Sequence, residues 1–215
     1  MSHSMRPFMS TPSRALLLLL LLASCTSSSL QDTSQTTLQW DFESEAAAQA
    51  FQPTSGEWKV EQASPAAGQG RVLSQLAQNP KPAFNVSLIE GIARKDLDIS
   101  VAFNAVAGEI DQGGGPIWRA ADGQNYYIAR YNPLEDNYRV YTVVNGVRTE
   151  LASADIPNSP GWHTLRVTMT GNHIQCYYDG GLALDVKDDT FAQSGGLGLW
   201  TKADAQTQFD DVLIR

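Results

Sequence analysis

The chain has 215 residues, of which 42% are hydrophobic and 18% charged, and its formal net charge is −8. It contains two cysteines, Cys25 and Cys176, and no basic cluster follows the first fourteen residues. This composition argues against a disulfide-rich scaffold and against a thiolate metal centre. The acidic balance argues against nucleic acid as a partner.

Residues 1–24 have the pattern of a bacterial lipoprotein signal peptide. Arg6 and Arg14 accompany an apolar run over residues 15–22, which is too short to cross a bilayer of about 30 Å as a helix. The tetrapeptide LASC at residues 22–25 resembles a lipobox, in which the cysteine is acylated and becomes the new N-terminus. We therefore expect lipidation at Cys25. The alternative is an ordinary secretory signal that ends near a cysteine.

Residues 25–37 are rich in Ser, Thr and Gln and predict a flexible tether between a lipid anchor and a domain over residues 38–215. Thr26 stands where an aspartate would favour inner-membrane retention. The resemblance therefore implies a bacterial cell-envelope protein anchored in the outer membrane. The domain is long enough for one sizeable core, and its sequence contains no repeat of 20 to 50 residues.

Most periodic segments of this domain alternate between apolar and polar residues, which is typical of half-buried strands. A short helix is predicted over residues 44–51, before most of the strands. Asn145-Gly146 and Asp179-Gly180-Gly181 have the composition of hairpin turns. The expected strands cover residues 98–104, 116–119, 126–131, 138–144, 147–151, 162–169, 174–178, 182–186, 196–202 and 207–214. Strands at this spacing predict an all-β fold, a two-sheet antiparallel jelly-roll sandwich.

Six short motifs share one resemblance. They are NYY at 125–127, NGV at 145–147, WHTLRV at 162–167, YDG at 178–180, GLGLW at 196–200 and FDDV at 209–212. Together they resemble the concanavalin-like lectin and glucanase superfamily. More narrowly, they are similar to laminin-G-like bacterial domains related to the 3-keto-disaccharide hydrolase (DUF1080) family. The resemblance implies a jelly roll whose curved sheet forms a groove that binds carbohydrate, whereas the motifs themselves specify no chemistry.

The alternation of side chains predicts which residues line that groove. If Leu197 and Leu199 face the core, Trp200 faces the other way. The same logic places Trp118 inside together with Tyr126 and Ile128. Aromatic faces suit the C–H surface of a sugar, and basic side chains donate to its oxygens. We therefore predict a ligand site formed by Arg119, Tyr127, Arg130, Tyr131, Trp200 and Lys202. The alternative is that a loop covers Trp200 and that Arg119 pairs with Glu135 or Asp136.

Hydrolysis of a glycoside requires two carboxyl groups at a defined separation. The Glu-x-Asp-x-x-Glu pattern of the superfamily's glucanases is missing from this sequence. The hydrolase-like relatives carry Glu and Gln at two groove positions that are aromatic here. The acidic pairs Glu135-Asp136 and Asp188-Asp189 lie in predicted turns, and Glu135 is the remaining candidate for a catalytic acid. These features favour binding over catalysis.

The first and last strands of a jelly roll commonly pair. Such pairing would gather the carboxylates of Asp41, Glu43, Asp210 and Asp211, which could hold a structural Ca²⁺. No other cofactor is expected. The predicted function is therefore a membrane-anchored lipoprotein that binds a glycan or glycoconjugate. The alternatives are an enzyme that processes glycosides or 3-keto-glycosides, and a module that binds another protein through Trp200.

Overall fold

The computed structural model describes Met1, residues 36–63 and residues 70–215. The predicted signal peptide, the lipidation site Cys25 and most of the predicted tether lie outside the described residues. Residues 35–215 form the unit of the chain that carries the strands. Within the described part, no helix is long and apolar enough to cross a membrane.

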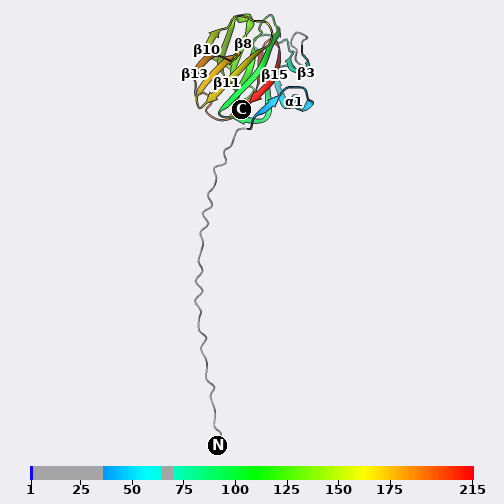
Figure 1. The fold of residues 1–215 in the computed structure, drawn as a ribbon. Helices are drawn as coiled ribbons and strands as arrows, with labels where there is room; N and C mark the ends of the chain where they lie inside the picture. The colour runs from blue at the N-terminus through cyan, green and yellow to red at the C-terminus, as the bar shows by residue number, and fades with distance from the viewer. Residues whose placement is uncertain (2–35, 64–69) are drawn as a thin grey trace. The chain divides into compact units, whose positions relative to one another are not determined.

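The strands form two antiparallel sheets that face each other, as the sequence predicts (Figure 1). The eight-stranded sheet has the order β13-β12-β11-β6-β15-β4-β3, with β1 paired to β15. The seven-stranded sheet has the order β10-β9-β8-β7-β14-β5-β2. In Figure 1, β10 and β13 lie at one side of the sandwich, and β3 and α1 at the other.

The elements of the eight-stranded sheet are β1 Leu38–Trp40, β3 Trp58–Gln62, β4 Arg71–Gln75, β6 Leu97–Ala107, β11 His163–Thr170, β12 His173–Tyr178, β13 Gly181–Lys187 and β15 Gln206–Ile214. Those of the seven-stranded sheet are β2 Phe51–Ser55, β5 Phe84–Arg94, β7 Gly114–Asp122, β8 Asn125–Asn132, β9 Asn137–Val144, β10 Val147–Asp155 and β14 Gly195–Lys202. Helix α1, Glu45–Gln49, begins after Ser44, whose side chain accepts from the Ala47 N–H, and a 3₁₀ turn spans Pro133–Glu135.

Both predicted hairpins are confirmed. In the first, Asn145 and Gly146 have φ values of 51° and 75°, and Val147 pairs with Val144. In the second, Asp179 and Gly180 have φ values of 47° and 81°. Two successive residues with positive φ match the right-handed twist of the flanking strands, which explains the Asn, Asp and Gly at these positions.

The main core lies between the sheets. Ile99, Val101 and Phe103 of β6 are fully buried there, on one face as their alternation predicts. From the opposite sheet, the Trp118 ring stacks on Tyr127 with 5.5 Å between centroids. The indole N–H of Trp118 donates to Sδ of Met169 on β11, which ties the two sheets together.

A second apolar cluster covers the outer face of the seven-stranded sheet. Its buried members are Val86, Ile117, Ala120, Tyr126, Ile128, Tyr141, Val143 and Trp200. Both faces of this sheet are therefore apolar. The strand β8, which contributes to both clusters, has a nearly continuous run of buried residues instead of an apolar–polar alternation.

Candidate functional site

Trp200 lies on the outer face of the seven-stranded sheet, as the alternation with Leu197 and Leu199 predicts. Its predicted exposure to solvent is wrong, because the side chain is fully buried. The indole N–H donates to the hydroxyl of Tyr126 over 3.0 Å, and the Phe84 ring lies 5.1 Å away. Trp200 therefore forms the floor of this face and is covered by neighbouring side chains.

The prediction that Tyr127 and Tyr131 line the groove is wrong. Both are fully buried in the main core, whereas Tyr126 and Ile128 occupy the outer face with Trp200. The hydroxyl of Tyr127 donates to the Asp188 carboxylate over 2.6 Å. Because both faces of β8 are apolar, hydrophobicity could not decide which face was which.

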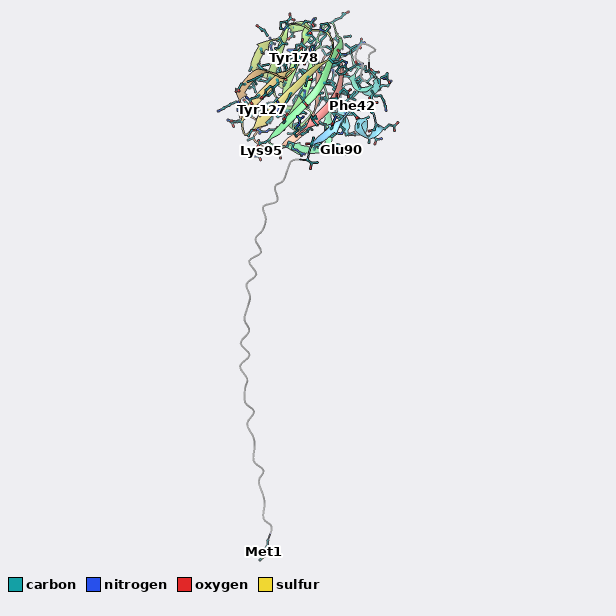
Figure 2. The ribbon with its side chains drawn as sticks, viewed as in Figure 1. Met1, Phe42, Glu90, Lys95, Tyr127 and Tyr178 are labelled. Carbon is teal, nitrogen blue, oxygen red and sulfur yellow. The ribbon has the colours of Figure 1, made fainter. Side chains whose placement is uncertain are left out.

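Arg119 also lies outside the site. It occupies a bulge of β7 with φ of 48°, and it is 3% exposed. Its guanidinium donates to the carbonyls of Lys95, Gly171 and Phe191 at 2.6 to 2.7 Å. Tyr127 and Lys95 lie on the same side of the domain in Figure 2. Arg119 therefore joins three chain segments at one end of the sandwich and is structural.

Lys202 is partly exposed on the outer face, whereas Arg130, which was also predicted to line the groove, is only 1% exposed. Both side chains meet carboxylates. Lys202 Nζ donates to Asp111 over 2.9 Å, and Arg130 Nη2 donates to Glu135 over 2.8 Å. Asp111 is fully buried and lies 4.0 Å from Arg130 Nη1. A third basic residue, Arg139, lies 3.7 Å from Glu135. This network brings basic and acidic side chains together along one edge of the second apolar cluster.

Arg148 crosses the same face from the edge strand β10. Its guanidinium carbon lies 4.2 Å from the centroid of Tyr141, 5.7 Å from Trp200 and 5.8 Å from Phe84. Four strands separate β10 from β5, which carries Phe84, in the sheet order. The face must therefore be strongly curved for these side chains to meet. Arg148 lies across the aromatic floor and covers part of it.

A pocket of about 680 Å³ opens beside Phe84, and we call it the hairpin pocket. It is lined by Thr54, Ser55, Phe84, Asp122, Gly123, Gln124, Asn145 and Gly146. Two hairpin tips form its wall. They are joined by hydrogen bonds from the Asn145 N–H to the Asn125 side chain and from the Gly146 N–H to the Gln124 carbonyl. The tip that contains Gly123 packs closely against β2: a Cβ added at Gly123 would lie only 2.8 Å from the Thr54 hydroxyl oxygen.

Glu135, the candidate catalytic acid, is held as an anion. Burial alone would raise its pKa, but the Arg130 guanidinium, with help from Asn137, Arg139 and Lys202, lowers it instead. A general acid needs the opposite shift, because it must keep its proton near neutral pH. The neighbouring carboxylate of Asp111 is already engaged by Lys202, the Gly113 N–H and the Asn132 amide.

The strand pairing behind the calcium prediction is confirmed, since Trp40 pairs with Val212 and Leu38 with Ile214. Two of the predicted ligands nevertheless accept hydrogen bonds from the backbone. Glu43 accepts from the Arg71 N–H over 2.7 Å, and Asp210 accepts from the Asp211 N–H over 2.8 Å. Among the described residues, no three His, Cys, Asp or Glu side chains are placed to hold a metal ion. The structure therefore gives the site Asp41, Glu43, Asp210 and Asp211 no support.

Sequence reasoning missed Phe84, Asp111, Tyr126, Tyr141 and Arg148. The position of Arg148 could have been inferred, because it follows the Asn145-Gly146 turn and pairs with Val143, a neighbour of Tyr126. Asp111 lies in a loop, where no periodic pattern indicates its direction. Its contact with Lys202 joins residues 91 positions apart, and only the folded sheet brings them together.

No family model and no curated protein matches this sequence. Similarity is found among solved structures. The carbohydrate binding module CBM66 from Bacillus subtilis aligns with a TM-score of 0.63 at 19% identity, over 76% of this chain and 93% of that one. The fold is a lectin-like jelly roll.

Two further structures show the same likeness. A protein of unknown function with a galectin-like fold, also from Bacillus subtilis, aligns with a TM-score of 0.62 at 12% identity, over 83% of this chain and 94% of that one. The cellulose induced protein Cip1 aligns with a TM-score of 0.61 at 12% identity, over 83% and 96% of the two chains. At these identities the shared feature is the fold of the sandwich, not its side chains.

Proposed function

We propose that this domain binds carbohydrate in the hairpin pocket. The observation that carries the proposal is a pocket of about 680 Å³ that combines one half-buried aromatic ring, Phe84, with a rim of amide, hydroxyl and carboxylate groups. An aromatic ring stacks on the C–H face of a pyranose, and side chains such as Gln124 and Asn145 exchange hydrogen bonds with its hydroxyls.

The aromatic floor next to the pocket supports the same proposal. Phe84 belongs both to the pocket lining and to the group around Trp200. A ligand longer than one sugar could extend from Phe84 toward Arg148 and Lys202, whose side chains remain partly exposed. One of the similar structures is a carbohydrate binding module, which adds support from an independent direction.

Binding is a better match than hydrolysis. Glu135 is ion-paired with Arg130, and Asp111 is fully buried beneath Lys202. Neither carboxyl group is arranged to donate a proton to a leaving group while the other attacks or activates water. A domain related to the 3-keto-disaccharide hydrolases would release product from a sugar substrate, so the binding experiment includes a search for product.

The first test is a titration of the purified chain with a panel of oligosaccharides, followed by tryptophan fluorescence. Trp200 lies 5.1 Å from Phe84 and reports on the pocket. We expect a saturable change, and we expect Phe84→Ala to weaken binding by about 1 to 2 kcal/mol through loss of stacking.

Phe191→Ala is the matched control, because Phe191 packs on Tyr127 away from the pocket and should leave affinity unchanged. Trp200→Phe tests the source of the signal. A folded chain that responds to none of the sugars would contradict the proposal, and product release would move the protein to the hydrolases.

We further propose that the domain is displayed in a bacterial cell envelope by lipidation at Cys25. The support is the order of charged leader, apolar run and LASC tetrapeptide in the sequence. Expression in a bacterium with a labelled fatty acid tests this. Incorporation that disappears in Cys25→Ser is the expected result, whereas unlabelled wild-type chain in the soluble fraction would contradict it. Density fractionation of the two membranes then tests the outer-membrane assignment.

A further inference from the structure

Arg148 is a charged side chain without a polar partner. The described residues offer it no hydrogen bond and no ion pair, and its Nη1 atom is buried. Its contacts are the rings of Tyr141, Trp200 and Phe84. Burial, the largest cause, lowers its pKa. A guanidinium withdrawn from water costs free energy unless an anion or an acceptor compensates it.

Arg130 is buried more deeply than Arg148, and it too has N–H groups without a hydrogen-bond acceptor. It is 1% exposed, and its Nη2 donates to Glu135, to the Asn137 side chain and to the Tyr141 hydroxyl. Its Nε and Nη1 atoms are buried and have no hydrogen-bond partner among the described residues. A fully buried guanidinium usually uses most of its five N–H groups.

The two guanidinium groups face one ring. The carbon atoms of Arg148 and Arg130 lie 4.2 Å and 5.9 Å from the Tyr141 centroid. Each charge disfavours the other, and the nearby acids are already engaged. Asp111 forms an ion pair with Lys202, and Glu135 forms ion pairs with both Arg130 and Arg139. The Nη1 atoms of both guanidinium groups, and Nε of Arg130, therefore have no hydrogen-bond acceptor among the described residues.

We propose that the carbohydrate bound by this domain is an acidic one, whose carboxylate is recognised by Arg148, next to the incompletely compensated charge of the buried Arg130. The inference rests on the proposed function and names its ligand class. The guanidinium of Arg148 lies 5.8 Å from the Phe84 centroid, which suits a carboxylate carried directly on a sugar ring that stacks on Phe84. A uronic acid has this arrangement, and guanidinium groups bind planar carboxylates through paired hydrogen bonds.

The side chains of the hairpin pocket, which Phe84 connects to Arg148, fit this division of roles. The carboxylate of Asp122 accepts from the Gln124 N–H and from the Asn125 amide at the rim. Its remaining lone pairs can accept from sugar hydroxyls, which is the role of an acid in a sugar site. The acidic group of the ligand therefore belongs at the Arg148 end, away from Asp122.

The test uses pairs of oligosaccharides that differ only in charge. Trigalacturonic acid is compared with its methyl ester, and the same pairing is made for oligomers of glucuronic and mannuronic acid. Binding to the purified chain is measured by calorimetry. We expect at least one acid to bind about tenfold or more tightly than its ester, with affinity that falls as salt is added.

Arg148→Met keeps the aliphatic stem over the rings and removes the charge, so it should abolish the preference for the acid over its ester. Arg166→Met is the matched control. Arg166 also lies over an aromatic ring, 4.8 Å from Tyr177, but on the eight-stranded sheet. Circular dichroism and thermal unfolding confirm that both variants fold. Arg148→Lys, which keeps the charge and loses the planar fork, should retain part of the preference.

The outcomes separate the two proposals. Equal affinity for acids and esters, or a preference that survives Arg148→Met, overturns the acidic ligand and leaves carbohydrate binding standing. A sulfated oligosaccharide that binds as tightly as the uronic acids overturns the carboxylate assignment. If no sugar of either kind binds to the folded chain, both proposals fail together.

Discussion

Asp210 lies on β15 with 3% of its surface exposed. Burial, and then the carboxylates of Asp211, Glu43 and Asp41, raise its pKa to about 7, although the Asp211 N–H opposes the shift. In the unfolded chain the same group loses its proton near pH 4. Between these two pH values the folded state holds a proton that the unfolded state has released. The contribution of Asp210 to stability is therefore lost as the pH rises from about 4 to about 7, and the loss is complete above that range.

We expect Asp210→Asn to remove this dependence, because an amide has no proton to lose in that range. At pH 8 the free energy of unfolding should rise by on the order of 2 kcal/mol, and at pH 4 it should change little. Urea denaturation of both proteins at several pH values measures the difference. Parallel pH profiles for the two proteins would show that Asp210 does not carry the effect.

Single side chains also mark the limit of what the sequence predicts. The direction of Trp200 followed from the two leucines beside it, and the structure confirms it. Its burial did not follow, because the atoms that cover it come from β5, β8 and β10. The parity of a strand tells which face a residue takes, whereas exposure depends on what other strands place over that face.

At the scale of elements, a bulge in β7 opposite β14 determines which residues face the site. The register of β14 against both β5 and β7 shifts between Gly196 and Gly198. Opposite the shift, Arg119 takes a positive φ of 48°. A bulge adds one residue to a strand and so reverses the alternation beyond it. For that reason, counting along β7 could not predict which face Arg119 takes. The two hairpins have regular turns, and their positions could be predicted.

The bulge needs glycine at position 198. A Cβ there would overlap the Ser87 carbonyl oxygen of the neighbouring strand, and backbone yields less readily than a flexible side chain. We expect Gly198→Ala to lower the free energy of unfolding by about 2 to 3 kcal/mol. At Gly181, another strand glycine, a Cβ would lie 3.5 Å from the Tyr178 carbonyl oxygen, an ordinary contact, so Gly181→Ala should change the free energy of unfolding by no more than about 0.5 kcal/mol. Equal losses in the two variants, measured by urea unfolding, would contradict the role of the bulge.

At the scale of the whole molecule, the sandwich was predictable because many local signals agreed. Hairpin turns, alternating strands and the pairing of the first strand with the last all point to the same two-sheet fold. The site was less predictable because its residues come from strands that are far apart in the sequence and from a loop. Phe84 meets Arg148, and Asp111 meets Lys202, only once the chain has folded into the curved seven-stranded sheet.

The buried thiol of Cys176 can be used to measure whether the domain unfolds as one cooperative unit. Cys176 lies on β12, between β11 and β13, and is fully buried. Burial raises the pKa of its thiol well above the usual value, so in the folded state it lacks both access and thiolate character. A thiol reagent can react only after the sheets separate. The rate of modification should therefore follow global unfolding and rise with urea in parallel with it.

Mass spectrometry of the peptide that contains Cys176 measures this rate separately from Cys25. Thr149→Cys, on the exposed edge strand β10, should instead react at once in the native protein. Fast modification of Cys176 without denaturant would mean that the edge formed by β12 and β13 opens on its own. β10 contacts β13 at that side of the sandwich, so such opening would also loosen the strand that carries Arg148. If Cys176 stays protected until global unfolding, Arg148 lies on a rigid support, as a preformed site for an acidic sugar requires.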